Sequence, residues 1–319
     1  MDILTELSAS DLSIGPSIVS LGNFDGVHLG HRALFRRLIN VARERQCVSV
    51  AYTFNPHPLK LLAPEKAPLL LNTVHEKRRL IEASHIDTLV EAPFTKELAA
   101  MTPEQFVDRI LIEKLKAQGL VIGYDYAFGK NRCGDAEFLK RYCVEKGVSV
   151  EVLQPVGNDG LPYSSTRIRQ LLQAGDVASA VSLLGRHYNL EGVVVSGKKR
   201  GRKIGFPTAN LETEKEQLPA PGVYAVKVRY NLQEYNGVVN LGSCPTFENG
   251  KSTIEVHLLD FSGDLYGQAI RIYFAERLRG ERKFSGLEEL SAAIRADIVS
   301  ARQILGSQQI IQYQEYLSY

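Results

Sequence analysis

The chain has 319 residues, of which 44% are hydrophobic, so it is long enough for two domains with ordinary buried cores. Its formal net charge of +2 gives no general indication of nucleic-acid binding. No apolar stretch approaches the roughly 18 residues of a membrane-spanning helix, and the N-terminus lacks the basic start and apolar run of a secretory signal. The cysteines at 47, 133, 143 and 244 have neither CxxC spacing nor a zinc-type cluster, so reduced thiols in a cytoplasmic protein are expected.

The first half of the chain alternates short apolar runs with helical patterns. The predicted strands are Ile18–Gly22, Val48–Phe54, Thr88–Ala92, Leu120–Gly123 and Ser149–Leu153. The predicted helices are His31–Gln46, Val74–Ser84, Pro103–Ala117, Asp135–Lys146 and, after the fifth strand, Thr166–Gln173. This alternation predicts an α/β domain with a Rossmann-like parallel sheet and helices on both of its faces.

After about residue 185 the pattern changes. Alternating or Val-, Ile- and Tyr-rich segments occur at 190–196, 222–230, 235–241, 252–260 and 268–276, separated by Gly, Pro and Asn clusters. They predict an antiparallel barrel or sandwich, followed by one long helix over Gly286–Leu305. We therefore expect one domain over residues 1–182 and a second over residues 183–319.

The segment GNFDGVHLGH, at residues 22–31, lies where the first strand ends and a helix begins. Ligands in open α/β sheets bind at this edge, and a helix N-terminus offers free backbone N–H groups to phosphate. His28 and His31 add donors for phosphate oxygens. The histidines alone also fit a surface pair or a partial metal site, and the turn matches neither GxGxxG nor the Walker pattern.

A second segment, SSTRIR at residues 164–169, opens the helix after the fifth strand. Its hydroxyl side chains are ordinary helix caps on one interpretation, and its two arginines could simply be solvated. On the other, hydroxyls, free N–H groups and guanidinium at one helix start form a triphosphate site.

Together these two segments resemble the HxGH nucleotidyltransferase superfamily with its ISSTxxR partner motif, with Tyr163 at a usually aliphatic position. TFNPHP at 53–58 and GYDYAFGKNRCG at 123–134 narrow the resemblance to bacterial FAD synthetases, with Tyr126 in place of a usual Phe. The resemblance implies that ATP adenylylates the 5′-phosphate of FMN and that pyrophosphate leaves. It assigns His28 and His31 to catalysis. It assigns ATP binding to Gly22, Phe24, Asp25, Gly30, Asp125, Ser165, Thr166 and Arg169, and FMN binding to Phe54, Pro56, His57 and Pro58.

In the second half, GKKRGRKIGFPTAN at residues 197–210 contains a basic run with glycine at every fourth position. A basic run is most often a solvated loop or a nucleic-acid patch. The glycine spacing, however, suits a loop that folds over phosphates. The hydroxyl of Thr208 and the amide of Asn210 supply oxygen ligands that suit Mg²⁺.

A later segment, IEVHLLDF at residues 254–261, alternates as a strand. The alternation places Ile254, Val256 and Leu258 on one face, and Glu255 and His257 on the other, together with Leu259. By itself, Glu255 fits an exposed strand residue, but a carboxylate facing a polar site can also accept a proton from a hydroxyl.

These two segments, with PGVYAV, GVVNLGSCPTF and DLYGQAIRIYFAERLRGERKF, resemble the riboflavin kinase domain in order and spacing. The resemblance implies that Glu255 activates the ribityl hydroxyl of riboflavin. ATP binding is assigned to Gly197, Lys203, Gly205, Thr208 and Asn210, and Mg²⁺ to the last two. At two positions the chain departs from the family, with His187 for a common Pro and Gly280 for a frequent Asp.

The two resemblances jointly imply a bifunctional flavin-cofactor enzyme that takes riboflavin, FMN and ATP and binds neither nucleic acid nor membrane. A monofunctional adenylyltransferase with a regulatory flavin-binding domain is the alternative, and intact Thr208, Asn210 and Glu255 argue against it. A nucleic-acid-binding regulator would need clustered basic and aromatic positions beyond one loop.

Overall fold

The computed structural model of the protein describes residues 1–5, 14–158, 160–197, 201, 204–242 and 253–312. The chain divides into two compact units, the first ending at Ser164 and the second beginning at Ser165. Helices α7 (Ser165–Ala174) and α8 (Val177–Leu184) therefore group with the second unit. The boundary at residues 182/183 stays a prediction from the sequence.

The first unit contains a six-stranded sheet in which every neighbouring pair is parallel. In spatial order its strands are β1 (Asp2–Leu4), β4 (Thr88–Pro93), β3 (Val48–Asn55), β2 (Ser17–Leu21), β5 (Ala117–Gly123) and β6 (Ser149–Leu153). Five of them confirm the predicted strands. The edge strand β1 was not predicted, because three residues carry too little periodicity to be recognised.

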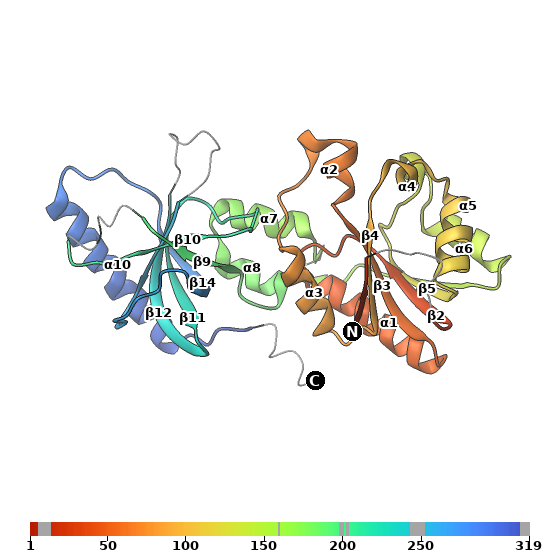
Figure 1. Ribbon diagram of the computed structural model, residues 1–319, viewed down its shortest axis with the longest axis horizontal. Helices are drawn as coiled ribbons and strands as arrows, with labels where there is room; N and C mark the ends of the chain where they lie inside the picture. The colour runs from red at the N-terminus through yellow and green to blue at the C-terminus, as the bar shows by residue number, and fades with distance from the viewer. Residues whose placement is uncertain (6–13, 159, 198–200, 202–203, 243–252, 313–319) are drawn as a thin grey trace. The chain divides into compact units, whose positions relative to one another are not determined.

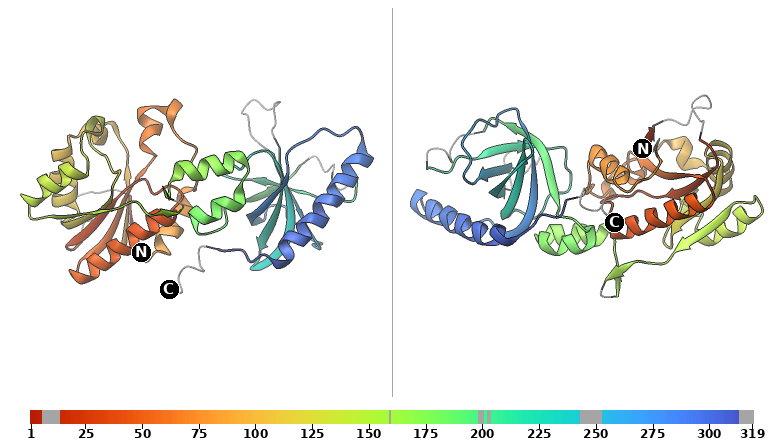
Figure 2. Two further views of the ribbon diagram at one scale, coloured as in Figure 1. Left: turned by 180° about the vertical axis from the view of Figure 1, so that it is seen from behind. Right: turned by 90° about the horizontal axis from the view of Figure 1, so that it is seen from below.

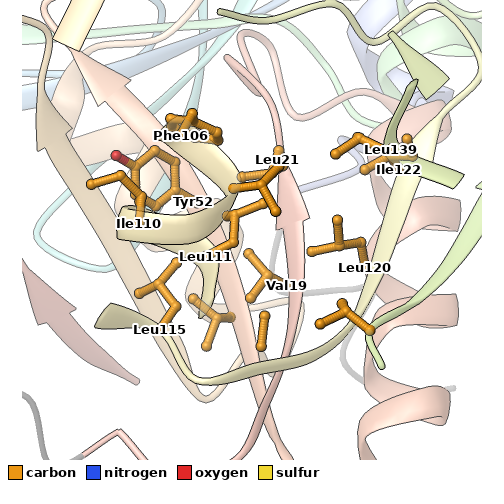
Figure 3. Close-up of a cluster of buried hydrophobic side chains, with 14 of the residues drawn as sticks. Val19, Leu21, Tyr52, Phe106, Ile110, Leu111, Leu115, Leu120, Ile122 and Leu139 are labelled. Atoms are coloured by element: carbon orange, nitrogen blue, oxygen red, sulfur yellow. The ribbon is translucent and has the colours of Figure 1, made fainter. Parts of the chain in front are cut away.

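Helices cover both faces of this sheet, as predicted (Figure 1). One face packs against α5 (Pro103–Phe106), its continuation as a π-helix, η2 (Val107–Lys114), and α6 (Ala136–Val144). Figure 3 shows the core between them, which includes Tyr52, Leu111 and Leu139. The prediction of one helix from Pro103 to Ala117 was wrong at its end, because Ala117 already pairs with Ser17 as the first residue of β5.

The opposite face of the sheet is covered by α1 (Leu29–Glu44), whose inward stripe of Leu34, Phe35 and Leu38 is buried. Helix α3 (Val74–Glu82) follows β3 in the chain and precedes β4. The remaining short elements of the unit are α2 (Pro58–Leu62), η1 (Pro64–Lys66), α4 (Lys96–Ala100), η3 (Lys130–Arg132), β7 (Gly157–Asn158) and β8 (Leu161–Pro162).

The second unit contains a closed antiparallel barrel. Of the two architectures predicted from the sequence, a barrel or a sandwich, the barrel is therefore the correct one. Around the barrel the strands are β10 (Ala209–Glu212), β13 (Thr253–Leu258), β12 (Gln233–Gly242), β11 (Gly222–Tyr230), β14 (Ala269–Arg279) and β9 (Asn189–Val195). Pairing of β9 with β10 closes the ring. The four-residue strand β10 escaped prediction because it is as short as the turns around it.

Helix α10 (Leu287–Ser307) runs along the outside of the barrel, as Figure 2 shows. Its Ala301 and Leu305 pack against outward-facing side chains of β11, β12 and β14, among them Ala225, Val238 and Tyr273. Arg279 at the end of β14 also pairs with the buried Asp297 of α10, with Nη2–Oδ2 at 2.8 Å. The outer faces of β10 and β13 are not part of this cluster, and the candidate kinase residues lie there.

Candidate functional site

The turn between β2 and α1 brings two imidazoles face to face. His28 is the N-cap of α1, and its ring stacks on that of His31 with centroids 3.7 Å apart. The backbone N–H of His31 donates to Nδ1 of His28 over 3.4 Å. Because Nδ1 of His28 accepts this bond, the proton of the neutral ring belongs on Nε2, which can then donate to a ligand.

The backbone of this turn contains two non-glycine residues with positive φ, a strained conformation that the packing around it must maintain. Phe24 and Val27 have φ values of 48° and 38°, and both side chains are buried. The Phe24 ring contacts His31 edge-on at 5.5 Å. A Cβ at Gly22 would lie 2.7 Å from the Phe24 ring, so glycine is required there. Strain of this kind is concentrated at functional sites in proteins.

Asp25 and Gly30 hold the turn in place. The carboxylate of Asp25 is buried and accepts the backbone N–H of Leu71 at 2.9 and 3.2 Å. A Cβ at Gly30 would lie 3.1 Å from the His28 ring and 3.5 Å from the Cβ of Tyr163. The chain that leads into the SSTRIR segment therefore passes beside the two imidazoles.

Two further predicted segments lie at the same carboxyl edge of the sheet. Phe54 lies near the end of β3 and contacts Phe94 edge-on at 5.3 Å. Pro56 and Pro58 flank His57, which caps α2 by accepting the N–H of Leu59 at 3.2 Å. Asp125 is exposed in the turn that follows β5. Since β3, β2 and β5 are neighbours, the residues at their ends share one edge.

The second motif opens α7. Ser165 is its first residue and Arg169 lies one turn later on the same side, while Ile168 and Leu172 are buried on another side. Thr166 is exposed. The helix belongs to the second unit, so the approach of these groups to His28 stays a prediction.

In the barrel, three polar residues from three strands lie in one row. Glu255 on β13 is directly opposite Asn210 on β10 and, on its other side, directly opposite Asn240 on β12. Ile254, Val256 and Leu258 are buried and Glu255 is half-buried, which confirms the alternation predicted for this strand. Cross-strand neighbours of this kind have Cβ atoms about 4.5–5.5 Å apart. Asn240 could not be assigned to the site from the sequence, because its position opposite Glu255 depends on how β12 pairs with β13.

Of the predicted phosphate-binding loop at residues 197–210, the structure describes residues 197, 201 and 204–210. A Cβ at Gly197 would overlap the carboxamide of Asn210, and one at Gly201 would lie 3.3 Å from Oγ1 of Thr208. Two glycines thus let the backbone approach both predicted Mg²⁺ ligands. Gly205 has φ 86°, a conformation that favours glycine. Lys203 lies outside the described residues.

His257 contacts the segment that carries Thr208. Its Nδ1 donates to the carbonyl of Pro207 over 2.7 Å, and its ring meets Phe206 edge-on at 6.1 Å. The sequence placed His257 beside Glu255 but gave no sign of this partner.

Two expectations for the end of this strand were wrong. Leu259 is buried, and β13 ends at Leu258. Asp260, which alternation placed on the same strand, lies beyond it with φ 58° and pairs with Arg302 at 2.7 Å. It therefore lies outside the strand that carries Glu255.

Comparison with known proteins covers both units. The FAD synthetase family model matches residues 12–167 and the riboflavin kinase family model matches residues 184–305. A bifunctional riboflavin kinase/FMN adenylyltransferase of Pseudomonas fluorescens is 40% identical over 90% of this chain and 92% of its own. That of Escherichia coli K12 is 38% identical over 91% and 93%.

The chain belongs to the bifunctional riboflavin kinase/FMN adenylyltransferase family. A solved structure from Streptococcus pneumoniae, described as a macrolide-efflux protein, is 33% identical, with a TM-score of 0.86 over 95% of this chain and 99% of its own. Efflux is a description of that protein only. None of the described helices combines the length and apolar character that crossing a membrane requires.

Proposed function

We propose that the chain carries out its two reactions at two separate sites, adenylyl transfer at the carboxyl edge of the parallel sheet and riboflavin phosphorylation on the outer face of the barrel. The activities are those of the family: ATP-dependent phosphorylation of riboflavin to FMN, then adenylyl transfer from ATP to FMN. A purely regulatory role for the barrel is not favoured, because the riboflavin kinase family model matches 184–305.

For the adenylyl transfer, the stacked imidazoles at the start of α1 support the assignment most strongly. An oxygen of the FMN phosphate attacks the α-phosphorus of ATP, and the bond from that phosphorus to pyrophosphate breaks. Nε2 of His28 and the N-terminal N–H groups of α1 stabilise the added negative charge. Ser165, Thr166 and Arg169 hold the departing pyrophosphate. No proton needs to leave the nucleophile, so positioning and charge neutralisation suffice.

For the kinase reaction, the row Asn210–Glu255–Asn240 carries the proposal. The Glu255 carboxylate accepts the proton of the riboflavin 5′-hydroxyl as that oxygen attacks the γ-phosphorus of ATP, and ADP leaves. Asn240, directly opposite, is placed to donate an amide hydrogen bond that orients the carboxylate or the flavin ribityl chain.

Magnesium is the cofactor we expect at this site. The hydroxyl of Thr208 and the amide oxygen of Asn210 are hard ligands, and the glycines at 197 and 201 let the loop backbone approach both of them closely. When bound, Mg²⁺ supplies neutralisation of the ATP phosphates. In the described ranges no three His, Cys, Asp or Glu side chains form a metal cluster, so Thr208 and Asn210 are the residues that would hold the ion.

One time course tests the two-site proposal. Purified protein is incubated with riboflavin, ATP and Mg²⁺, and FMN and FAD are separated as they form. FMN should accumulate first and FAD should follow. Omitting Mg²⁺ should stop the first step. Absence of either product from a folded protein would contradict the proposal.

A further inference from the structure

A buried polar cluster lies beside the His28 turn and has no role in the assignments above. It is centred on Lys77 of α3, whose Nζ donates to Oγ1 of Thr53 over 3.3 Å. Thr53 in turn donates to the backbone carbonyl of Asn23 over 3.1 Å. The Thr53 hydroxyl thus links the Lys77 ammonium group by two consecutive hydrogen bonds to the backbone of the turn that carries the imidazoles. It has three protons and, within the described part of the chain, this single hydrogen bond.

A second unsatisfied group, the amide of Asn72, lies in the segment that leads into α3. Asn72 is 5% exposed, and neither its Oδ1 nor its Nδ2 has a hydrogen-bond partner among the described residues. The preceding residue, Leu71, is tied to Asp25 of the turn through its N–H. Burying an amide without a partner costs free energy, so a native protein seldom does it unless a ligand or water completes the bonds.

Among the residues that the structure describes, no carboxylate forms a direct ion pair with Lys77. The buried carboxylate of Glu91 on β4 is the register partner of Thr53 and already binds Arg78, with Nε–Oε2 at 3.0 Å. Burial lowers the pKa of Lys77, whereas the charges of Glu91 and Asp25 raise it. A bound anion would favour the charged ammonium further.

The position of the Lys77 ammonium group favours one anion, the 5′-phosphate of FMN, as its ligand. Thr53 donates to Asn23, which begins the turn that is proposed to hold the ATP phosphates, and in the chain it precedes Phe54, the first residue of the proposed flavin loop. In adenylyl transfer, the group that must lie between the ATP phosphates and the flavin ring is the 5′-phosphate of FMN. A lysine ammonium is a common ligand for such a group.

We propose that Lys77, assisted by the amide of Asn72, binds the 5′-phosphate of FMN in the adenylyltransferase site. Lys77 neutralises the nucleophile as it approaches the negatively charged ATP, and it discriminates FMN from flavins that lack the phosphate. The inference rests on the proposed location of the adenylyltransferase site at this edge of the sheet.

The test compares Lys77→Met, Lys77→Arg and the surface control Lys140→Met in the full-length protein. Lys140 is a matched control because it lies in the same unit and, among the residues that the structure describes, forms only an exposed pair with Glu137. The KM values for FMN and ATP in FAD formation are measured, together with the inhibition constant of lumiflavin, which has the flavin ring and no phosphate. Because riboflavin phosphorylation is assigned to the second unit, thermal unfolding and circular dichroism of the same samples report whether the first unit is folded.

We expect Lys77→Met to raise the KM for FMN about tenfold to a hundredfold, the value of a charge-assisted hydrogen bond. The KM for ATP and the lumiflavin constant should stay within about twofold of the parent, and Lys77→Arg should recover most of the loss. Asn72→Ala should show a smaller change in the same direction.

An equal weakening of FMN and lumiflavin would overturn the proposal, because it would mean that Lys77 only shapes the pocket. A change confined to the KM for ATP, or no change at all, would also overturn it. His28→Ala separates this inference from the site on which it rests. If His28→Ala leaves FAD formation unchanged while Lys77→Met still raises the KM for FMN, the role of the imidazoles fails and that of Lys77 stands.

Discussion

Asn210 and Glu255 lie directly opposite each other in the antiparallel pairing of β10 with β13, although 45 positions separate them in the sequence (255 − 210). One of them is the proposed magnesium ligand and the other the proposed base. Strand register alone therefore brings the proposed magnesium ligand and the proposed base to one point on the barrel surface.

Replacement of Glu255 by Gln tests the base. The amide keeps the size of the side chain and most of its hydrogen bonding but cannot accept the ribityl proton. Kinase turnover should fall by about 10²–10⁴-fold, the usual contribution of a general base. FAD formation from supplied FMN should persist. Turnover within a few-fold of the parent would remove Glu255 from the mechanism.

His28→Ala and Arg169→Ala should each reduce FAD formation and leave riboflavin phosphorylation near normal. Each removes a proposed donor to a phosphate whose charge grows in the transition state, a contribution of roughly 2–4 kcal/mol by comparison with oxyanion-hole donors. Separate assays with FMN and with riboflavin measure the two activities. A parallel loss of both would indicate misfolding or one shared site.

His257 is expected to position Thr208 through the carbonyl of Pro207. His257→Ala should raise the KM for ATP in the kinase reaction by about 2–12-fold, the net value of one hydrogen bond. His257→Asn is the matched control, because its amide nitrogen can replace Nδ1 as a donor, and it should restore most of the affinity. If the Ala and Asn variants behave alike, the hydrogen bond has no positioning role.

Protonation of His187 is expected to weaken the hydrogen bond that anchors the chain at Ile311, and so to make the stability of the protein depend on pH. Its buried Nδ1 accepts the N–H of Ile311 at 2.9 Å, and burial lowers its pKa below the ordinary value of 6.5. A lowered pKa means that the unfolded chain binds the proton more readily. The stability contribution is therefore present above pH about 6.5 and is lost as the pH falls through the native pKa.

The unfolding midpoint should therefore decrease between pH 7.5 and pH 5 by more in the parent than in a His187→Gln variant, which cannot titrate. Hydrogen exchange at Ile311 should show the same difference. Identical pH dependence in the two proteins would exclude this residue as the source.

Truncation tests where the second unit begins. The backbone N–H of Ala220 donates to the carbonyl of Leu172, and Nη1 of Arg277 donates to the carbonyl of Ala174, so α7 is bonded to the barrel. A fragment that starts at residue 165 should be more stable than one that starts at residue 183. The expected difference is at least about 2 kcal/mol for the lost burial of side chains such as Leu172. Equal denaturant midpoints would support the later boundary.

Much of the fold was predictable because its signals are local. Strand–helix alternation predicted the parallel sheet, and the period-two pattern of β13 predicted that Glu255 would face away from Val256. Within the described residues, the local signal failed for the short strands β1, β7, β8 and β10, and at the end of β13, where a left-handed turn at Asp260 breaks the alternation.

The sequence by itself determined the family, both reactions and the two turns that carry the motifs, because those motifs are runs of neighbouring residues with a fixed chemical pattern. Only the tertiary structure decided that Asn240 lies opposite Glu255, that His257 holds Pro207, and that Lys77 reaches Thr53. These are contacts between residues 15 to 50 positions apart (255 − 240, 257 − 207, 77 − 53). These contacts depend on strand register and helix packing, which are determined by burial of residues far apart in the sequence and cannot be predicted from a local pattern.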